Sequence, residues 1–364
     1  MITINQPFYS DSSLTDIQDV IESRSWVCGP TVAKLESLMC TLTDMQYAVA
    51  VANATVAIEL TIQCLNPHKN AEIITPSFTY KSAITAIMRA GCRPVFADIN
   101  DQYVIDVEDS KYMERLFTEN TIAVMGTDMF GFPCDSLALR NLAHDHGVDY
   151  IEDASQAIGA KLLGNHVGSL SDVVVFSFYA TKNVGCGEGG ILLTNDRVIY
   201  ERAIQLREAN LLAIENTLGR TLMVGSNLRM SEITAPLAID GITNLSNIVS
   251  ARRRNASKLQ KYLEIVHPHF AENRMSAWNT FPILSEDRDG LMNYLNKNGV
   301  QAKPYYDYLV NYDPAFVEFY GQQETPKALE VSKKILSLPV HQGLNDIHMR
   351  AIAEKVKAYE PAAR

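Results

Sequence analysis

Two residues of the sequence combine a reactive side chain with a position at or just past the end of an apolar run. Asp153 directly follows the run 149–152, and Lys182 comes five residues after Ser177, which ends the run 173–177. If both runs are strands of one parallel sheet, their carboxyl ends lie at the same edge, where ligands bind in such folds. An acid and an amine would then face one pocket.

An aldehyde cofactor such as pyridoxal 5′-phosphate (PLP) needs this pair. A lysine amine forms a Schiff base with it, and a carboxylate beside the pyridine nitrogen strengthens its electron sink. Its phosphate needs N–H groups at a helix N-terminus, which Asn53-Ala54-Thr55 offers together with the Thr55 hydroxyl. Ser177 supplies a second hydroxyl, and Tyr80 opens the helix after the next strand and can stack on the cofactor ring.

Each of these residues also has an ordinary structural explanation. Asn-x-Thr before a helix is usually an N-cap, and an Asp or Lys at a strand end is usually a surface residue. The order and spacing of the whole set therefore favour a cofactor site more than any single residue does.

The elements that must position this set alternate between strand and helix over the first two-thirds of the chain. Helices are expected at 55–64, 80–90 and 135–146. Strands separated by helices indicate an α/β fold, in which a mainly parallel sheet is sandwiched by helices. The expected strands are 47–51, 72–75, 94–97, 121–125, 149–152, 173–177 and 190–194.

The pattern changes near residue 230. Helical runs at 230–245 and 252–263 precede expected strands at 279–284 and 300–303 and expected helices at 291–297 and 347–359. We therefore predict a large domain, residues 1–244, and a smaller α+β domain, residues 245–364. Arg252-Arg253-Arg254 is the densest basic run and is expected to form a solvated helix face.

The composition excludes several classes of protein. The 364 residues are 47% hydrophobic, which is ordinary for a soluble globular protein, and the net charge of −10 argues against a nucleic-acid-binding surface. We see no membrane span and no signal peptide, so we expect a cytoplasmic protein. The six cysteines lack metal-ligand spacing and are expected to be buried or half-buried free thiols, while His144 and His146 are expected at the surface.

Several segments together resemble the DegT/DnrJ/EryC1/StrS group of sugar aminotransferases, which are PLP enzymes of fold type I. The resemblance covers nearly the whole chain and implies a large PLP-binding domain and a small C-terminal α+β domain. It also implies transfer of an amino group from an amino acid, with glutamate the expected donor, to a keto-sugar, expected to be nucleotide-linked, in amino-sugar biosynthesis. The segments that carry the resemblance are Trp26–Glu36, Thr75–Tyr80, Glu152–Gln156, Ser177–Asn183, Gly187–Gly190, Gly225–Glu232 and Leu336–Pro339.

The same resemblance implies roles for individual residues. Lys182 corresponds to the Schiff-base lysine that also moves the proton, and Asp153 to the partner of the pyridine nitrogen. Gln156 corresponds to the residue that hydrogen-bonds the phenolic oxygen of the cofactor, and Tyr80 to the ring stacked on it. PLP would alternate with its amine form, pyridoxamine phosphate (PMP), during turnover.

The phosphate contacts implied by the resemblance come from two chains. Ala54, Thr55 and Ser177 correspond to contacts within one subunit. Asn227 corresponds to an asparagine that reaches the phosphate of the neighbouring subunit, so the resemblance implies a homodimer with shared active sites.

Three departures from the family pattern bear on these expectations. Ala54 stands where glycine is usual in the phosphate loop, which is expected to weaken phosphate binding. The run 207–210 replaces a usual His-Gly, and the run 305–309 lacks a usual histidine. Both runs are expected to lie beside the substrate.

Three alternatives remain on the sequence alone. A PLP- or PMP-dependent sugar dehydratase on the same scaffold would carry histidine in place of Lys182. A catalytically silent regulator or partner subunit would explain the altered substrate-side runs, although Asp153, Gln156, Ser177 and Lys182 are intact. A non-PLP α/β protein would require that the spacing is coincidental.

Overall fold

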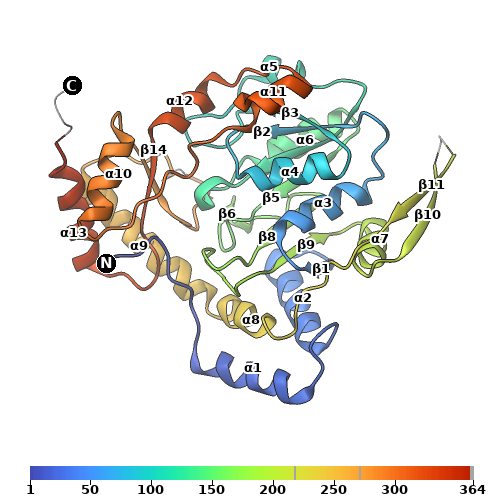
Figure 1. The fold of residues 1–364 in the computed structure, drawn as a ribbon, viewed down its shortest axis with the longest axis horizontal. Helices are drawn as coiled ribbons and strands as arrows, with labels where there is room; N and C mark the ends of the chain where they lie inside the picture. Colours follow the sequence, from blue (N-terminus) through green and yellow to red (C-terminus); the bar gives the residue numbers. More distant parts are fainter. Residues whose placement is uncertain (217–218, 270–271, 361–364) are drawn as a thin grey trace.

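A seven-stranded sheet forms the centre of the computed structural model, which describes residues 1–216, 219–269 and 272–360. The strands are β1 (Tyr47–Val51), β2 (Glu72–Pro76), β3 (Arg93–Ala97), β4 (Thr121–Thr127), β5 (Asp149–Asp153), β8 (Val173–Ser177) and β9 (Gly190–Thr194). Their spatial order is β1-β9-β8-β5-β4-β2-β3 (Figure 1). Strand β9 is antiparallel to both its neighbours, and the remaining pairs are parallel. All seven lie at predicted runs, and the α/β fold class is confirmed.

The central strands are apolar along their length because both faces of the sheet are buried. In β8, Val173 and Val175 pack into one core, and Val174 and Phe176 pack into the other. This alternation follows from the pleat, which points successive side chains to opposite faces. Helices on both faces therefore enclose the sheet.

The helices divide between the two faces. One face is covered by α3 (Ala54–Cys64), α4 (Lys81–Arg89) and α7 (Arg197–Arg207). The other is covered by α2 (Pro30–Thr43), α5 (Ser110–Glu114), α6 (Ser136–Asp145), α8 (Ala235–Thr243) and the first part of α9 (Leu245–Leu263). Helix α1 (Asp11–Ser23) lies below the sheet and contacts α8 (Figure 1). None of the helices in the described ranges is long and apolar enough to span a bilayer.

A second core lies beside the sheet, where α9 passes into the C-terminal part of the chain. Trp278, Phe281, Leu295 and Leu336 are among its buried side chains. The elements around it are β13 (Phe281–Leu284), β14 (Ile335–Leu338), α10 (Arg288–Lys297) and α13 (Asp346–Lys357). The remaining elements are β6 (Lys161–Leu162), β7 (Asn165–His166), β10 (Leu211–Asn216), β11 (Gly219–Val224), β12 (Arg274–Met275), α11 (Pro314–Tyr320), α12 (Pro326–Lys334) and the short 3₁₀ turns η1 (Met129–Gly131) and η2 (Val310–Tyr312).

Contacts between the two cores cross the predicted boundary at residues 244 and 245. The N-terminal Ile2 forms a bridge with Val300, so the first residues pack on the C-terminal core. In the other direction, α12 sits against the sheet, where the Asp98 carboxylate accepts hydrogen bonds from the N–H groups of Lys327 and Ala328. The division into two domains therefore stays a proposal.

Some predicted elements differ from the observed ones. The run 300–303 is not a strand: Val300 and Lys303 each make one isolated bridge, because their partners are the N-terminus and β14 rather than a continuous neighbour. The helix expected from residue 230 begins at Ala235. The hairpin β10–β11 was not predicted, and its strands pair only with each other.

The basic run 252–254 contradicts one prediction. Arg253 and Arg254 are exposed, but Arg252 is fully buried on the inner side of α9. Its guanidinium donates to the carbonyls of Trp278 and Asn279 at 3.2 and 3.0 Å and to Asn5 Oδ1 at 2.7 Å. Arg252 thus ties the N-terminal segment to the loop before β13, which a sequence pattern of three adjacent arginines does not reveal.

The cysteines and histidines largely follow their predictions. All six cysteines lie in the described ranges and are free thiols, but Cys28 is exposed, which corrects the expectation of burial for that residue. His144 and His146 lie at the surface, where they contact Asp172 and Glu114.

The segment 26–36 contains the start of α2, where N–H groups bind a carboxylate that is distant in the sequence. The Glu232 carboxylate accepts hydrogen bonds from the N–H groups of Gly29, Thr31 and Val32 at 2.8 to 3.0 Å. A carboxylate there satisfies N–H groups that the helix itself leaves unpaired. A methyl group on Gly29 would lie 2.8 Å from a carboxylate oxygen of Glu232, so the carboxylate would have to shift from its position at the helix start.

Candidate active site

A cavity of about 550 Å³ opens at the carboxyl edge of the sheet. Strands β1, β5 and β8 end at this edge, as expected for ligand sites in open α/β sheets. Seven of the eight predicted site residues line the cavity, namely Ala54, Thr55, Tyr80, Asp153, Gln156, Ser177 and Lys182. The tertiary structure thus brings together residues spread over more than a hundred positions of the sequence.

The two walls of the cavity have different origins. We call the side chains at the start of α3, at the strand ends and in the loop after β8 the sheet-edge wall. It comprises Ala54, Thr55, Asp153, Ser177 and Lys182. We call the residues from the C-terminal part of the chain the loop wall; it comprises Asn279, Tyr305 and Tyr306. The loop wall was not predicted as a set, although the run 305–309 was expected near the substrate.

One end of the sheet-edge wall has the features of an anion site. Asn53 caps α3, because its side chain accepts the Val56 N–H at 3.1 Å, and the first backbone bond of the helix runs from Ala57 N–H to Asn53. The N–H groups of Ala54 and Thr55 precede that bond and lie at the positive end of the helix dipole. Ser177 ends β8 and lines the same cavity. N–H groups and hydroxyls of this kind hold phosphates.

Gly190 keeps the turn before α3 close to the sheet. It pairs with both Val51 and Ser177, and a methyl group on it would meet the backbone of Asn53 and lie 2.5 Å from the Ala54 nitrogen. The backbone requirement for glycine therefore falls on Gly190. Ala54 itself begins a regular helix without a positive φ, so the conformational reason for expecting glycine there does not apply.

Lys182 lies in a tight loop that the loop wall supports. Its N–H donates to the Tyr179 carbonyl at 2.8 Å, and the Asn279 side chain donates to the Thr181 carbonyl at 3.3 Å. Desolvation lowers the pKa of the Lys182 amine to about 8, although the nearby negative charge of Asp153 acts in the opposite direction. The amine is thus neutral in roughly a tenth of the molecules at pH 7, far more often than an exposed lysine.

Asp153 is a buried carboxylate at the end of β5. Burial raises its pKa, whereas hydrogen bonds from Ser155 and the charge of Lys182 lower it. Its Oδ1 accepts the Ser155 N–H at 3.1 Å, which fixes the side chain at the strand end. A buried carboxylate here can pair with a protonated ring nitrogen of a ligand.

Gln156 is oriented by its backbone surroundings. Its Oε1 accepts the Phe130 N–H at 2.9 Å, so its amide nitrogen must be the group that faces Tyr306, with Nε2 3.3 Å from the Tyr306 hydroxyl. The Tyr306 ring lies against the half-exposed Tyr80 ring, with 5.4 Å between centroids. Tyr306 of the loop wall thus contacts the Gln156 amide through its phenol.

Two predicted segments lie outside the cavity. The run 207–210 was expected beside the substrate, but Arg207 instead pairs with Glu36 and Glu208 at 3.0 Å and does not line the cavity in this chain. Asn227 is exposed and does not line it either. Its neighbours Leu228 and Arg229 pair with β1, where the Ala52 N–H donates to the Leu228 carbonyl at 2.8 Å.

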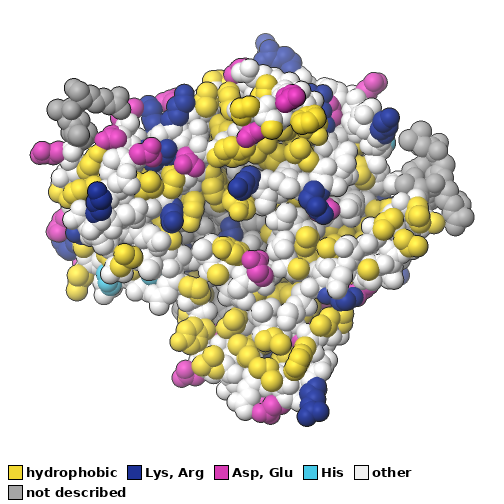
Figure 2. All heavy atoms as spheres, in the orientation of Figure 1, with side chains coloured by type: hydrophobic (Ala, Val, Ile, Leu, Met, Phe, Trp, Pro, Cys, Tyr) yellow, Lys and Arg dark blue, Asp and Glu magenta, His cyan; other side chains and the backbone are white. Residues whose placement is uncertain are grey.

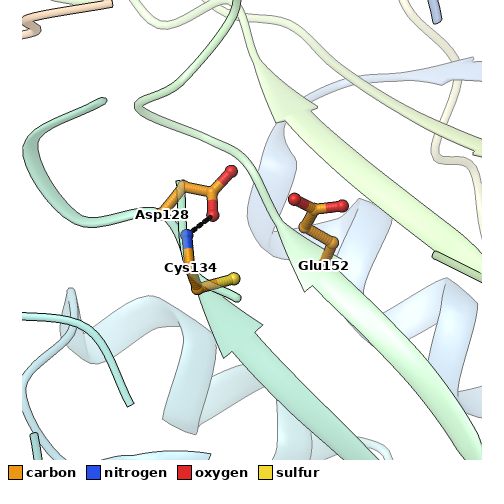
Figure 3. A group of neighbouring side chains, drawn as sticks. All are labelled: Asp128, Cys134 and Glu152. Atoms are coloured by element: carbon orange, nitrogen blue, oxygen red, sulfur yellow. Dashed lines mark hydrogen bonds between the residues drawn. The ribbon is translucent and has the colours of Figure 1, made fainter. Parts of the chain in front are cut away.

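Three buried side chains behind Asp153 have the types that bind metals. Oxygen and sulfur atoms of Asp128, Cys134 and Glu152 lie within 4.8 Å of one another, and Figure 3 shows the two carboxyl groups side by side. Both oxygens of Glu152 already accept hydrogen bonds, from Ser136 at 2.7 Å and Gly168 at 2.9 Å. Burial and the charge of Glu152 raise the pKa of Asp128 well above its ordinary value, which favours an uncharged Asp128 beside Glu152.

Comparison with known proteins shows what this arrangement belongs to. Residues 9–357 match the DegT/DnrJ/EryC1/StrS aminotransferase family. The chain is 30% identical over 373 aligned positions to GDP-perosamine synthase from Vibrio cholerae, with 99% of both chains covered. It is 29% identical to a pleiotropic regulatory protein from Geobacillus stearothermophilus, with 94% of this chain and 93% of that protein covered.

A solved structure agrees in fold over the full length. The crystal structure of Streptomyces venezuelae DesV in complex with a ketimine intermediate superposes with a TM-score of 0.87, at 27% identity and with 98% of each chain covered. Named relatives include sugar aminotransferases, and the family depends on PLP, which confirms the predicted enzyme class and cofactor. The chain belongs to the DegT/DnrJ/EryC1/StrS aminotransferase family.

Proposed function

We propose that this enzyme moves an amino group from glutamate to a keto-sugar carried on a nucleotide, in amino-sugar biosynthesis. The observation that carries the proposal is the meeting of Lys182, Asp153 and the N-terminus of α3 in one cavity. Along the sheet edge, the buried Asp153 carboxylate ends β5, Lys182 lies in the loop after β8, and the anion site begins α3 after β1. These groups fit PLP at its ring nitrogen, its aldehyde and its phosphate.

Each residue has a defined task in this proposal. Ala54, Thr55 and Ser177 hold the phosphate, and Asp153 keeps the ring nitrogen protonated. Lys182 anchors the cofactor, is displaced by the incoming amine, and then moves the proton between substrate and cofactor as a general base. Bound PLP would supply an electron sink for the electron pair left on the carbon when this proton is removed. The low pKa of Lys182 suits this task, because only the neutral amine accepts a proton.

The proposed enzyme is a homodimer in which Asn227 reaches the phosphate of the partner subunit. Among the described residues that line the cavity, Lys182 is the only cationic side chain, so a sugar nucleotide would need charge from elsewhere. Arg229, near Asn227, is half-buried and pairs with Glu208 at 3.0 Å.

Apolar side chains gather over α1 in the lower part of the molecule (Figure 2), and the exposed ones there and in the following loop are Leu14, Ile21, Trp26 and Val27. This exposed apolar surface supports a subunit interface over α1 and the loop that follows it.

A cytoplasmic location is proposed together with this function. Its support is the state of the six cysteines, all of which lie in the described ranges as free thiols.

Absorbance spectroscopy tests the cofactor part of the proposal. Purified protein mixed with PLP should acquire a visible absorption band that depends on Lys182, and Lys182→Ala should lack the band. Glutamate should then replace the band with the near-ultraviolet absorption of PMP. A wild-type protein that stays colourless in PLP would overturn the proposal.

A panel of keto-sugar nucleotides with different nucleotides and ketone positions tests the substrate. The PMP-loaded enzyme should regain the visible band with at least one of them and with no nucleotide that lacks the ketone. If no member of the panel restores the band, the keto-sugar assignment is wrong even though the cofactor assignment stands.

Subunit complementation tests the shared site. Lys182→Ala and Asn227→Ala should each be impaired alone, but subunits exchanged between them should form one intact site per mixed dimer and recover activity. Failure of the mixture to exceed either variant alone would contradict the role of Asn227 in the partner's site.

The second candidate is a regulator, and one observation favours it: a relative of similar identity is named a pleiotropic regulatory protein. A regulatory protein on this scaffold would bind PLP through Lys182 and leave the band unchanged with every amino donor. The glutamate step in the absorbance experiment separates the two candidates.

A further inference from the structure

Tyr306 is the residue of the loop wall that reaches the cofactor region most directly. It follows Lys303, which pairs with Ser337 of β14, so the C-terminal core fixes the segment. Its ring packs against Tyr80 and Tyr305, at centroid distances of 5.4 Å in both cases. These contacts leave the hydroxyl as the polar end of the side chain inside the cavity.

The hydroxyl of Tyr306 has a proton to offer to a ligand. Because Gln156 Oε1 is held by the Phe130 N–H, its Nε2 donates and the Tyr306 oxygen accepts, at 3.3 Å. A phenol that accepts a hydrogen bond still has its own proton free for donation. Burial, together with the negative charge of Asp153, raises the pKa of Tyr306, so the group stays protonated in the neutral range.

The proposed function identifies an acceptor for this hydroxyl proton, the phenolic oxygen of PLP. The family resemblance places Gln156 at the phenolic oxygen of PLP, and the Tyr306 hydroxyl contacts the amide of Gln156. We propose that Tyr306 is a positioning residue for the cofactor, which donates a second hydrogen bond to the phenolic oxygen and holds the Gln156 amide toward it. This inference rests on the proposed PLP site and adds to it a residue from the C-terminal part of the chain.

The pH dependence of the visible absorption band of bound PLP tests the inference without measuring turnover. Tyr306→Phe removes the donor, which leaves more negative charge on the phenolic oxygen and holds a proton on the neighbouring nitrogen to higher pH. The midpoint of the band should therefore move upward by about one pH unit, and the Kd for PLP should rise about tenfold.

Tyr308→Phe is the matched control. Tyr308 belongs to the same segment, but its hydroxyl donates to Asp313 at 2.6 Å and lies outside the cavity. Its removal should leave both the midpoint and the Kd for PLP as in the wild type. Equal shifts in the two variants would assign the effect to the segment rather than to the hydroxyl and would overturn the inference.

A second variant changes Gln156, the hydrogen-bond partner of the Tyr306 hydroxyl. Gln156→Glu keeps the acceptor for Phe130 N–H but replaces the donor with a carboxylate that draws the Tyr306 proton away from the cavity. It also removes the Gln156 donor to the phenolic oxygen, so it should shift the midpoint in the same direction as Tyr306→Phe and by at least as much. A wild-type midpoint in folded Tyr306→Phe would refute the inference while the Lys182-dependent band still stands, whereas loss of the band in the wild type would refute the proposed function as well.

Discussion

On the sheet-edge wall, every side chain ends a strand, starts a helix or lies in the short loop after a strand. On the loop wall, Asn279, Tyr305 and Tyr306 come from irregular segments. Lys303, just before the two tyrosines, pairs with Ser337 of β14, while Tyr305 and Tyr306 themselves pack against a core of the sheet. The first wall is built by local rules, because a parallel sheet always places its strand ends and helix starts at one edge. The second wall depends on how the C-terminal core docks, and there the chain departs from its family pattern.

This difference between the walls suggests that one of them binds the cofactor and the other fits the substrate. The sheet-edge wall contains the groups that the cofactor needs, and Ala54 is the one residue of this wall that was expected to depart from the family pattern. The loop wall contains phenols and an amide, which can adapt the rest of the cavity to a particular substrate. Variants that affect one wall and spare the other test this division.

The largest effect is expected from the buried arginine that supports the loop wall. Arg252→Ala removes the donor of the Trp278 and Asn279 carbonyls and of Asn5, so the free energy of unfolding should fall by about 3 kcal/mol. Arg253→Ala, one residue on and exposed, should change it by less than about 0.5 kcal/mol. Urea unfolding measures both, and equal stability of the two variants would contradict the support assigned to Arg252.

A comparable loss is expected on the sheet-edge wall from Gly190→Ala. The methyl group would meet backbone at Asn53 and Ala54, which cannot move without displacing the anion site, so the Kd for PLP should rise about 100-fold. Gly343→Ala is the control, because the added methyl would meet the end of the flexible Gln6 side chain far from the cavity. Titration of PLP into each protein gives the result, and unchanged affinity in Gly190→Ala would show that the turn is not part of the site.

A smaller effect concerns the electrostatic pair of the sheet-edge wall. The charge of Asp153 favours the ammonium form of Lys182, so Asp153→Asn should lower the midpoint for reaction of the Lys182 amine from about 8 by about one pH unit. Labelling of the cofactor-free protein with an amine-reactive reagent over a pH series, read by mass spectrometry, follows Lys182 alone. An upward shift would mean that desolvation, and not Asp153, changes in the variant.

The smallest effect is expected at Ala54, the position where the family has glycine. Because Ala54 sits in a regular helix with an ordinary φ, Ala54→Gly should change the Kd for PLP by less than about threefold. A large gain in affinity would show that the Ala54 methyl group narrows the phosphate site after all.

Much of the fold and of the sheet-edge wall could be predicted from the sequence, because these features depend on short segments of the chain. The run Val173–Ser177 is too apolar to be anything but a buried strand, and Asp153 follows another such strand, so both were placed at the sheet edge. Asn53 was predicted as the cap of a helix, and it both caps α3 and lines the cavity. The family resemblance then added roles that the residues alone did not assign.

The differences from prediction share a physical cause. The whole run 252–254 was predicted to be solvated because it is basic and helical, but the burial of Arg252 depends on the side of α9 that faces Trp278 and Asn5. The run 207–210 was expected beside the substrate, and within this chain ion pairs with Glu36 and Glu208 hold Arg207 away from the cavity. Both outcomes depend on partners far away in the sequence.

By itself, the sequence determined the alternating strands and helices, the acid and the lysine at the sheet edge, and the capped start of the helix beside them, because hydrophobic period, caps and strand ends are local properties. The tertiary structure decided that Gly190 rather than Ala54 carries the need for glycine, and that Tyr306 faces Gln156 across the cavity. It also decided that one arginine of three is buried. These features arise only where segments distant in the chain pack against each other, since a backbone clash or a hydrogen bond is defined by both partners at once.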